Sequence, residues 1–455
     1  MKMFDRSSLN DGVASREVLG WSLYDFANSG YTTVVLTAVF NAYFVGVIAQ
    51  GADWGTLLWT LTLSISSLAV MLTAPAIGAW TDSHGTKKRL LAVSTAACVL
   101  TTAGLYFTHS GTLILAMMLI ILSNYFFAIG ETLNAAFLPE LARPEAMGRV
   151  SGWGWSFGYF GGMLTLGLSL AWVLSAQAAG QGASQFVPVT MLITAVVFAI
   201  AALPMFAFVT ERRSQLAGTA AAAPLVSSGF VRSVADSLAQ LRRNWHEARA
   251  FPDFSRLLLC GLSYQAGISV VVALAAIYAE QVMGFAQSET MMLIFLVNIA
   301  AAIGAFGFGY VQDRIGHRRA LAVTLLGWII MVLLAGLGES RGVFWMAAVM
   351  AGLCMGSSQS TGRALAGLLA PVARRAEFYG LWAFATRLSA VVGPVTYGSL
   401  TFATGGNHRL AILMTGGFFV VGLLLMIGLD VDRGRRAALA ADADADADTD
   451  TDTDT

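Results

Sequence analysis

Charged residues and cysteines are both scarce in this chain of 455 residues. Only 12% of the residues are charged, 56% are hydrophobic, and the mean hydropathy is +0.68. An ordinary soluble domain carries about 25% charged residues, so this composition excludes a soluble globular protein. The three cysteines, Cys98, Cys260 and Cys354, lie in apolar runs without metal-like spacing, so we expect packing residues rather than a disulfide or metal site.

Catalytic motifs are missing as well. The five histidines have no metal-like spacing with acidic residues. The chain has neither a glycine-rich loop ending in Lys-Ser or Lys-Thr nor a serine or cysteine nucleophile motif. We therefore expect a protein that is not an enzyme, has no metal, cofactor or nucleic-acid partner, and contains no ATP-driven pump.

Long apolar runs dominate what is present. A membrane-spanning helix needs about 20 apolar residues, and twelve such runs lie between residues 17 and 429. They predict an all-α membrane protein with twelve transmembrane helices. With both termini in the cytoplasm, the only basic residues in external loops are Arg341 and Arg409, which is the distribution that the positive-inside rule requires. We expect a multi-pass protein of the bacterial inner membrane, monomeric in the bilayer.

The polar segments divide the chain into five parts. A short cytoplasmic N-terminus, a first six-helix bundle, a cytoplasmic connector with a basic amphipathic helix, a second six-helix bundle and an acidic tail are expected at 1–16, 17–210, 211–253, 254–429 and 430–455. The tail alternates Ala or Thr with Asp and cannot bury a core, so its composition predicts disorder.

The two bundles share a repeated loop. "GAWTDSHGTKKR" at 78–89 recurs as "GYVQDRIGHRRA" at 309–320, at a constant offset of 231 residues. Each copy places a glycine for close helix approach, an aspartate for a helix N-terminus, a second glycine for a turn and then basic residues. The predicted gating residues are Gly78, Asp82, Gly85, Lys88, Arg89, Gly309, Asp313, Arg314, Gly316, Arg318 and Arg319. A plain cytoplasmic turn explains the basic residues but not the paired aspartates.

Four charged residues lie well inside predicted spans: Asp25, Glu131, Arg363 and Arg387. Each costs about 2.5 to 3.5 kcal/mol at a helix centre. They either form a structural ion-pair network or serve as proton-binding acids and substrate-binding arginines, with Asp25 the better proton candidate. The residues predicted for a substrate and proton cavity are Tyr24, Asp25, Asn28, Glu131, Asn134, Tyr264, Gln265, Arg363 and Arg387.

Glycines predict close helix packing. Gly154, Gly158 and Gly162 follow one another at four-residue spacing in "GWGWSFGYFGG", which lets two helices approach closely. Gly393 followed by Pro394 predicts a kink in the eleventh span. The glycine spacing favours a moving bundle, whereas simple tight packing explains Gly393 and Pro394 at least as well as a gating role does.

The duplicated loop resembles the signature loop of the major facilitator superfamily. "GWSLYDFANSGYTTVV" at 20–35 and "GRVSGWGWSFGYFGG" at 148–162 resemble one branch of it, that of the autophagy-related vacuolar effluxer and its bacterial relatives. The resemblance implies two pseudo-symmetric six-helix bundles that alternate access between two faces, and amino-acid efflux is assigned to the fungal members. In the seventh span that branch tends to carry an acid, where this chain has "SYQAGIS" with Gln265.

The hypothesis is therefore a secondary active transporter that moves a small polar organic solute, with an amino acid as the leading class, coupled to protons. The alternative is a transporter-like sensor or scaffold that binds a ligand without moving it. The repeated loops favour transport, since a rigid scaffold has little use for two of them.

Overall fold

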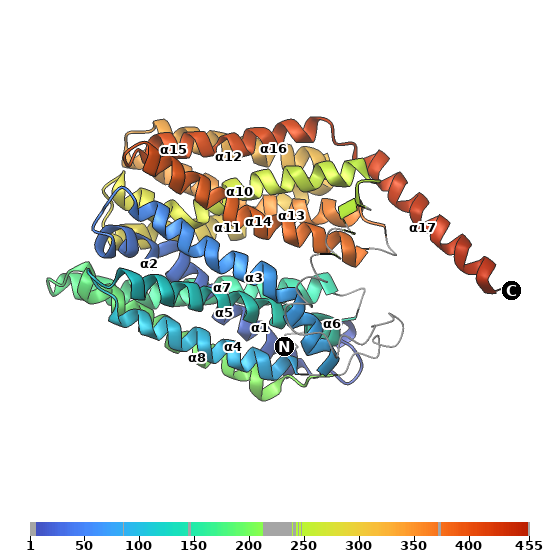
Figure 1. Ribbon diagram of the computed structural model, residues 1–455, viewed down its shortest axis with the longest axis horizontal. Coiled ribbons are helices and arrows are strands. Elements are labelled where there is room, and N and C mark those ends of the chain that lie inside the picture. The colour runs from blue at the N-terminus through green and yellow to red at the C-terminus, as the bar shows by residue number, and fades with distance from the viewer. Residues whose placement is uncertain are drawn as a thin grey trace. The chain divides into compact units, whose positions relative to one another are not determined.

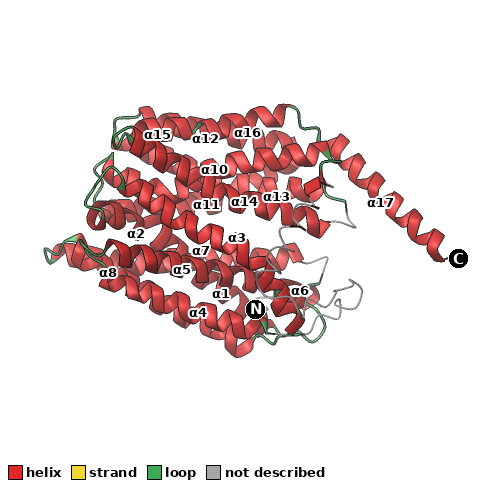
Figure 2. Cartoon of the chain, in the orientation of Figure 1, coloured by secondary structure: helices red, strands yellow, loops and turns green. Residues whose placement is uncertain are grey.

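The structure is a computed structural model that describes the chain except for residues 1–5, 85, 144–146, 213–238, 240–242, 244, 247, 372–374 and 454–455. Within the described residues every regular element is a helix (Figure 2), and the one extended pairing is an isolated bridge between Leu9 and Ala142. The predicted all-α class is confirmed. The predicted connector helix lies mostly outside the described residues.

Two compact units divide the chain, and each is described by itself. The first contains residues 1–237 and 273–295, and the second contains 238–272 and 296–455. The boundaries therefore cut the seventh and eighth spans, so that residues 273–281 of the seventh and 287–295 of the eighth belong to the first unit. Figure 1 gives the order of the helices along the chain.

The helices of the first unit begin with the first span. They are α1 (Ser15–Tyr31), α2 (Phe40–Tyr43), α3 (Gly55–His84), α4 (Lys87–Gly104), α5 (Leu113–Ala135), α6 (Leu138–Leu141), α7 (Met147–Ala178) and α8 (Ala183–Phe208). Two further helices cross the unit boundary, α10 (Pro252–Gln281) and α11 (Gln287–Ile315).

The first span is not a regular α-helix along its whole length. After α1 it continues as π-helical turns at Thr32–Ala38 and Phe44–Ile48 on either side of α2, with a break at Val39 where φ is −126°. The β-branched run Thr32–Val35 has low helix propensity. Wider π turns inside a helix often mark functional positions, so this segment is a candidate for movement.

The second unit holds the remaining helices. They are α12 (His317–Leu337), α13 (Arg341–Leu368), α14 (Arg375–Ala403), α15 (His408–Thr415), α16 (Gly417–Ile427) and α17 (Val431–Thr453). Ten of the described helical stretches are long and apolar enough to cross a membrane. Although α13 and α14 have the length of a span, with 28 and 29 residues, they are not among those ten. The count of twelve spans therefore stays a prediction.

The acidic end of the chain is helical as α17 (Figure 1), which differs from the predicted disorder. Alanine has the highest helix propensity, and every second residue of 441–447 is Ala. The start of α17 is attached to α10 through Arg433, whose guanidinium donates to both carboxylate oxygens of Asp253 at 2.7 Å.

Equivalent pairs of spans pack closely in the two units. In the first, α1 packs along α7 and α8, and α3 packs on α5. In the second, Gly393 of α14 lies against the backbone of Ala266 on α10, and Gly304 of α11 lies against the backbone of Leu353 on α13. The pair α1 and α7, spans one and five, therefore corresponds to α10 and α14, spans seven and eleven. The pair α3 and α5, spans two and four, corresponds to α11 and α13, spans eight and ten, as a duplicated bundle requires.

Candidate functional site

Asp25 lies where three helices of the first unit meet. Its Oδ1 accepts a hydrogen bond from Nδ2 of Asn134 on α5 at 3.0 Å. Its Oδ2 faces Gly154 of α7, where an added Cβ would collide with it. The indole of Trp21, one turn earlier on α1, donates to the Asn134 backbone carbonyl at 2.9 Å. These contacts fix the carboxyl between α1, α5 and α7.

Glu131 brings a second acid to this group. It lies three residues before Asn134 on α5, and its charge acts on the Asp25 carboxyl. The Glu131 side chain is exposed, whereas Asp25 is half-buried. The cavity that the sequence predicted for both residues stays a prediction.

Asn28 presents a buried amide that is not satisfied. Asn28 is 6% exposed, and neither its Oδ1 nor its Nδ2 has a hydrogen-bond partner among the described residues. Oδ1 of Asn134 is also buried without a partner. Leaving a buried polar group unpaired costs about 1 to 3 kcal/mol. Orphan amides beside a carboxyl are therefore groups that a polar ligand would satisfy.

Tyr24 does not share this polar site. It is 1% exposed, and its hydroxyl is within 2.9 Å of the Thr95 hydroxyl on α4. The phenol also fills the space beside Gly130 of α5. Adjacent residues on an α-helix point about 100° apart, so Tyr24 and Asp25 cannot face the same way. The structure assigns Tyr24 to helix packing, which differs from its predicted place in the cavity.

A second polar group lies in the second unit. The amides of Gln265 on α10 and Gln359 on α13 donate to each other, at 3.0 and 3.1 Å. Gln359 is exposed, and the Tyr264 hydroxyl next along α10 is buried without a hydrogen bond that meets normal geometry. Arg387 of α14 is half-buried, whereas the side chain of Arg363 lies outside the described residues. This amide pair can bind a polar solute, and Gln359 was not predicted.

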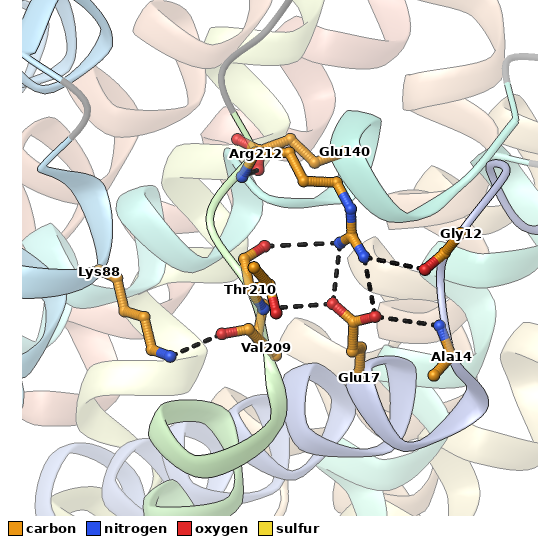
Figure 3. A network of polar contacts seen from close by, with 8 residues as sticks. All are labelled: Gly12, Ala14, Glu17, Lys88, Glu140, Val209, Thr210 and Arg212. Atoms are coloured by element: carbon orange, nitrogen blue, oxygen red, sulfur yellow. Dashed lines mark hydrogen bonds and ion pairs between the residues drawn. The ribbon is translucent and has the colours of Figure 1, made fainter.

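Figure 3 shows a charged network at the end of the first unit where the chain begins. The guanidinium of Arg212 donates to both carboxylate oxygens of Glu17, each at 2.8 Å. The backbone N–H of Arg212 donates to Glu140 at 2.9 Å. The hydrogen bonds to Glu17 raise the pKa of Arg212 above its usual value, so the guanidinium stays charged. The network ties α1 and α6 to the start of the connector.

The same network holds the first copy of the repeated loop. The carboxylate of Glu211 accepts from the backbone N–H groups of Lys87 and Lys88 at the start of α4, at 2.9 and 3.2 Å. The Lys88 ammonium donates to the Val209 carbonyl at 2.6 Å, as Figure 3 shows. An acid at a helix N-terminus is favourable, and Glu211 fills this role here. Arg89, which was also predicted as a gating residue of this loop, is exposed.

Both copies of the loop are only partly described. In the first copy the surroundings of Gly78 and the side chain of Asp82 lie outside the described residues, as does Gly85. In the second copy the same holds for the surroundings of Gly309 and the side chain of Asp313. Gly316 precedes α12 with φ of +83°, a conformation that favours glycine. Arg318 donates to the Ile427 carbonyl at 2.9 Å, and Arg314 and Arg319 are exposed.

The predicted packing glycines line one face of α7 against α1. An added Cβ would meet Asp25 at Gly154, the Ser29 hydroxyl at Gly158 and the Thr33 hydroxyl at Gly162. Gly161 comes closest to α1, because its Cβ would overlap the Phe26 backbone. Pro394 follows Gly393 inside α14. The glycine face therefore determines how far the Asp25 carboxyl stands from α7.

Solved structures show the class of this fold. The nucleoside transporter NupG superposes with a TM-score of 0.66 at 12% sequence identity, covering 91% of this chain and 99% of that one. The fold is that of a major facilitator superfamily transporter, as the repeated loop predicted.

Sequence comparison identifies the family. Residues 55–149 and 144–439 match the family described as vacuole effluxer Atg22 like, and the chain belongs to it. An uncharacterized MFS-type transporter, YxiO of Bacillus subtilis, is 25% identical over 89% of this chain and 93% of its own length. Autophagy-related protein 22-1 of Penicillium rubens is 26% identical over 64% of this chain. This chain covers 50% of that fungal relative.

Some functional candidates were outside the reach of sequence reasoning. Glu17, Glu140 and Glu280 lie near predicted span ends, where a charge ordinarily reaches water. Glu17 pairs with Arg212 and Glu140 with Lys87, each 50 or more residues away along the chain. The neighbour of Glu280 is Thr290, which lies across the turn between α10 and α11. Gln359 carries no charge and follows two serines, so nothing in the sequence distinguished it as a candidate binding residue.

Proposed function

We propose that this protein is a proton-coupled secondary transporter of a small polar organic solute, working by alternating access, with an amino acid as the leading class. The observation that carries the proposal is the polar group of Asp25, Asn28 and Asn134, where a half-buried carboxyl lies beside buried amide atoms that have no hydrogen-bond partner among the described residues. In a membrane-spanning bundle such groups are expensive, and they persist where they bind something.

The chemistry of the group suits an amino acid. A carboxylate attracts an ammonium group, and the amide nitrogen of Asn28 can donate to a carboxylate oxygen. The amide pair of Gln265 and Gln359 supplies further donors and acceptors in the second unit. The family description names an effluxer, which supports outward movement of solute. We further propose that both termini lie in the cytoplasm, as the positive-inside rule predicts, and that a single chain is the working unit.

Proton coupling follows from the two acids. Asp25 and Glu131 act on each other electrostatically, so binding a cationic group near them changes how many protons they hold. A solute that binds at this site would release or take up a proton. That exchange couples the solute to a proton gradient.

A thermal-shift screen of the purified protein against amino acids, dipeptides, sugars and nucleosides tests the proposal. A solute from the polar classes should raise the unfolding temperature of the native protein but not that of Asn28→Leu. The solute should then cross the membrane of proteoliposomes containing the native protein. Binding without flux would instead support a sensor or scaffold, and equal shifts in both proteins would place the site elsewhere.

A further inference from the structure

Glu280, at the end of α10, is a half-buried acid that the proposed site does not use. Its Oε1 is buried without a hydrogen-bond partner among the described residues. The neighbouring polar group is the hydroxyl of Thr290 on α11. That hydroxyl belongs to a residue that is 0% exposed and also lacks a partner with normal geometry. The Oε1 atom of Glu280 and the Thr290 hydroxyl are therefore both buried, and neither has a hydrogen-bond partner of normal geometry among the described residues.

The irregular part of the first span closes over this region. The Asn41 amide of α2 donates to the Ala273 carbonyl of α10 at 3.1 Å. The Gln287 amide of α11 donates to the Ala38 carbonyl at 3.3 Å. Gly46 lies beside the Gln281 side chain, 3.5 Å from an added Cβ. All these residues belong to the first compact unit, and together we call them the span 1 junction.

The junction contains backbone that can change its partners. Ala38 and Asn41 flank the break at Val39, between the two π-helical turns. Asn41 also bonds the Thr37 carbonyl within its own segment at 3.0 Å. Hydrogen bonds between amide side chains and backbone carbonyls are neutral and exchange readily with water. The junction can therefore open without breaking an ion pair.

The charged groups around Glu280 are few. The segment 32–48 contains no Asp, Glu, Lys, Arg or His, and residues 273–290 of α10, the following turn and α11 contain one other charged residue, Glu289. That acid already accepts from the Ala286 N–H at 2.8 Å at the start of α11. The groups that act on the Glu280 carboxyl are the surrounding apolar residues and the Thr290 hydroxyl. A buried carboxylate without a counter-ion is costly, and a protonated acid avoids that cost.

We propose that Glu280 is a proton-binding site whose occupancy is linked to the span 1 junction: the carboxyl holds a proton while the junction is closed and exchanges it when the junction opens. A protonated Glu280 can donate to the Thr290 hydroxyl, which gives both orphan atoms a partner. An ionised Glu280 needs water, and water can reach it when residues 38–46 move away. By the predicted orientation this end of α10 faces the external side, so external protons would favour closure.

The inference rests on the proposed function, because a linkage between closure and protonation serves a transporter that alternates access. It can nevertheless be tested without a solute. The Gly46→Cys, Gln281→Cys double variant places two thiols across the junction, and the fraction cross-linked by mild oxidation reports closure. Measurements in proteoliposomes over a range of external pH compare this pair alone with the pair carrying Glu280→Gln, which imitates the protonated acid.

The expected result is a cross-linked fraction that falls at least about twofold from acidic to alkaline pH when Glu280 is present. With Glu280→Gln it should stay at the acidic value throughout. Glu289→Gln is the matched control, since it removes the neighbouring acid and should leave the pH dependence intact. The proposal is overturned if Glu280→Gln keeps the pH dependence, if Glu289→Gln abolishes it, or if the pair shows no pH dependence with Glu280 in place.

The result is separable from the solute site. Loss of solute flux in every preparation would contradict the proposed function while the cross-linking could still follow Glu280. Flux that depends on Asp25, with cross-linking that ignores Glu280, would contradict only the present inference.

Discussion

The ion pair between Arg212 and Glu17 should stabilise the first unit measurably, and a double-mutant cycle tests it. The pair has two charge-assisted hydrogen bonds of 2.8 Å, and the Glu17 side chain is 6% exposed. Arg212→Ala would leave Glu17 with only the backbone donors Ala14 and Thr210. A hydrogen bond to a charged group contributes about 1.5 to 3 kcal/mol, and removing one partner of a buried pair costs about 3 to 5 kcal/mol.

Because Arg212 is 31% exposed, solvent screening lowers the expected cost to about 2 kcal/mol. The entropy of unfolding is about 2 cal/mol/K per residue, so over 455 residues this cost corresponds to a decrease of about 2 °C in unfolding temperature. Arg212→Lys should recover less than half of the loss, because an ammonium cannot form the bidentate contact.

The assay is thermal unfolding of the purified protein for Arg212→Ala, Glu17→Gln and the double variant. The double variant should unfold at nearly the temperature of the worse single variant, which gives a coupling energy of at least about 1 kcal/mol. Asp11→Asn is the control, because the Asp11 and Arg143 side chains are 97% and 48% exposed and such pairs contribute little. Additive single effects, or a control loss of equal size, would refute the reasoning.

Three further substitutions test the packing and the polar site. Asn28→Leu removes two buried polar atoms that have no hydrogen-bond partner among the described residues. It should increase the free energy of unfolding by about 1 to 2 kcal/mol, and therefore the unfolding temperature, while abolishing solute binding. A lower unfolding temperature would contradict the idea that the amide is unpaired. Gly161→Ala places a Cβ in the Phe26 backbone and should cost about 1 to 3 kcal/mol, whereas Gly167→Ala on the same helix meets nothing within 4 Å; equal effects on thermal unfolding would argue against the close packing. Gly316→Ala should lower the free energy of unfolding by about 1 to 2 kcal/mol, because φ is +83°. An unchanged unfolding temperature would show that residue 316 does not need this positive φ.

The sequence was most informative where chemistry and periodicity coincide. The apolar runs predict the helices, and the loop repeated at 78–89 and 309–320 predicts the superfamily. Asp25 and Asn134 are 109 residues apart, yet each is costly inside a span, so their cost alone indicated function. Gln359 and Glu280 could not be found in this way, because an amide among serines and an acid at a span end are both ordinary until their surroundings are known.

The local backbone conformation and the direction of individual side chains also could not be predicted from the sequence. The π-helical turns of the first span depend on how residues 32–48 meet α10 and α11, which are distant in sequence. Tyr24 looked polar beside Asp25, but its direction is set by the helical turn and by Thr95. The helix α17 forms where low complexity predicted disorder, since local propensity and its attachment at Asp253 both favour a helix.

Proton-driven transport by the Asp25→Asn variant, measured in proteoliposomes with a solute from the thermal-shift screen, tests the central claim most directly. Asparagine keeps the size and can still contact Asn134, but it cannot bind or release a proton. The predicted result is loss of uphill transport by at least about tenfold, one factor of ten being about 1.4 kcal/mol, with counterflow exchange retained. Unchanged uphill transport driven by a pH gradient in Asp25→Asn would contradict a coupling role for Asp25.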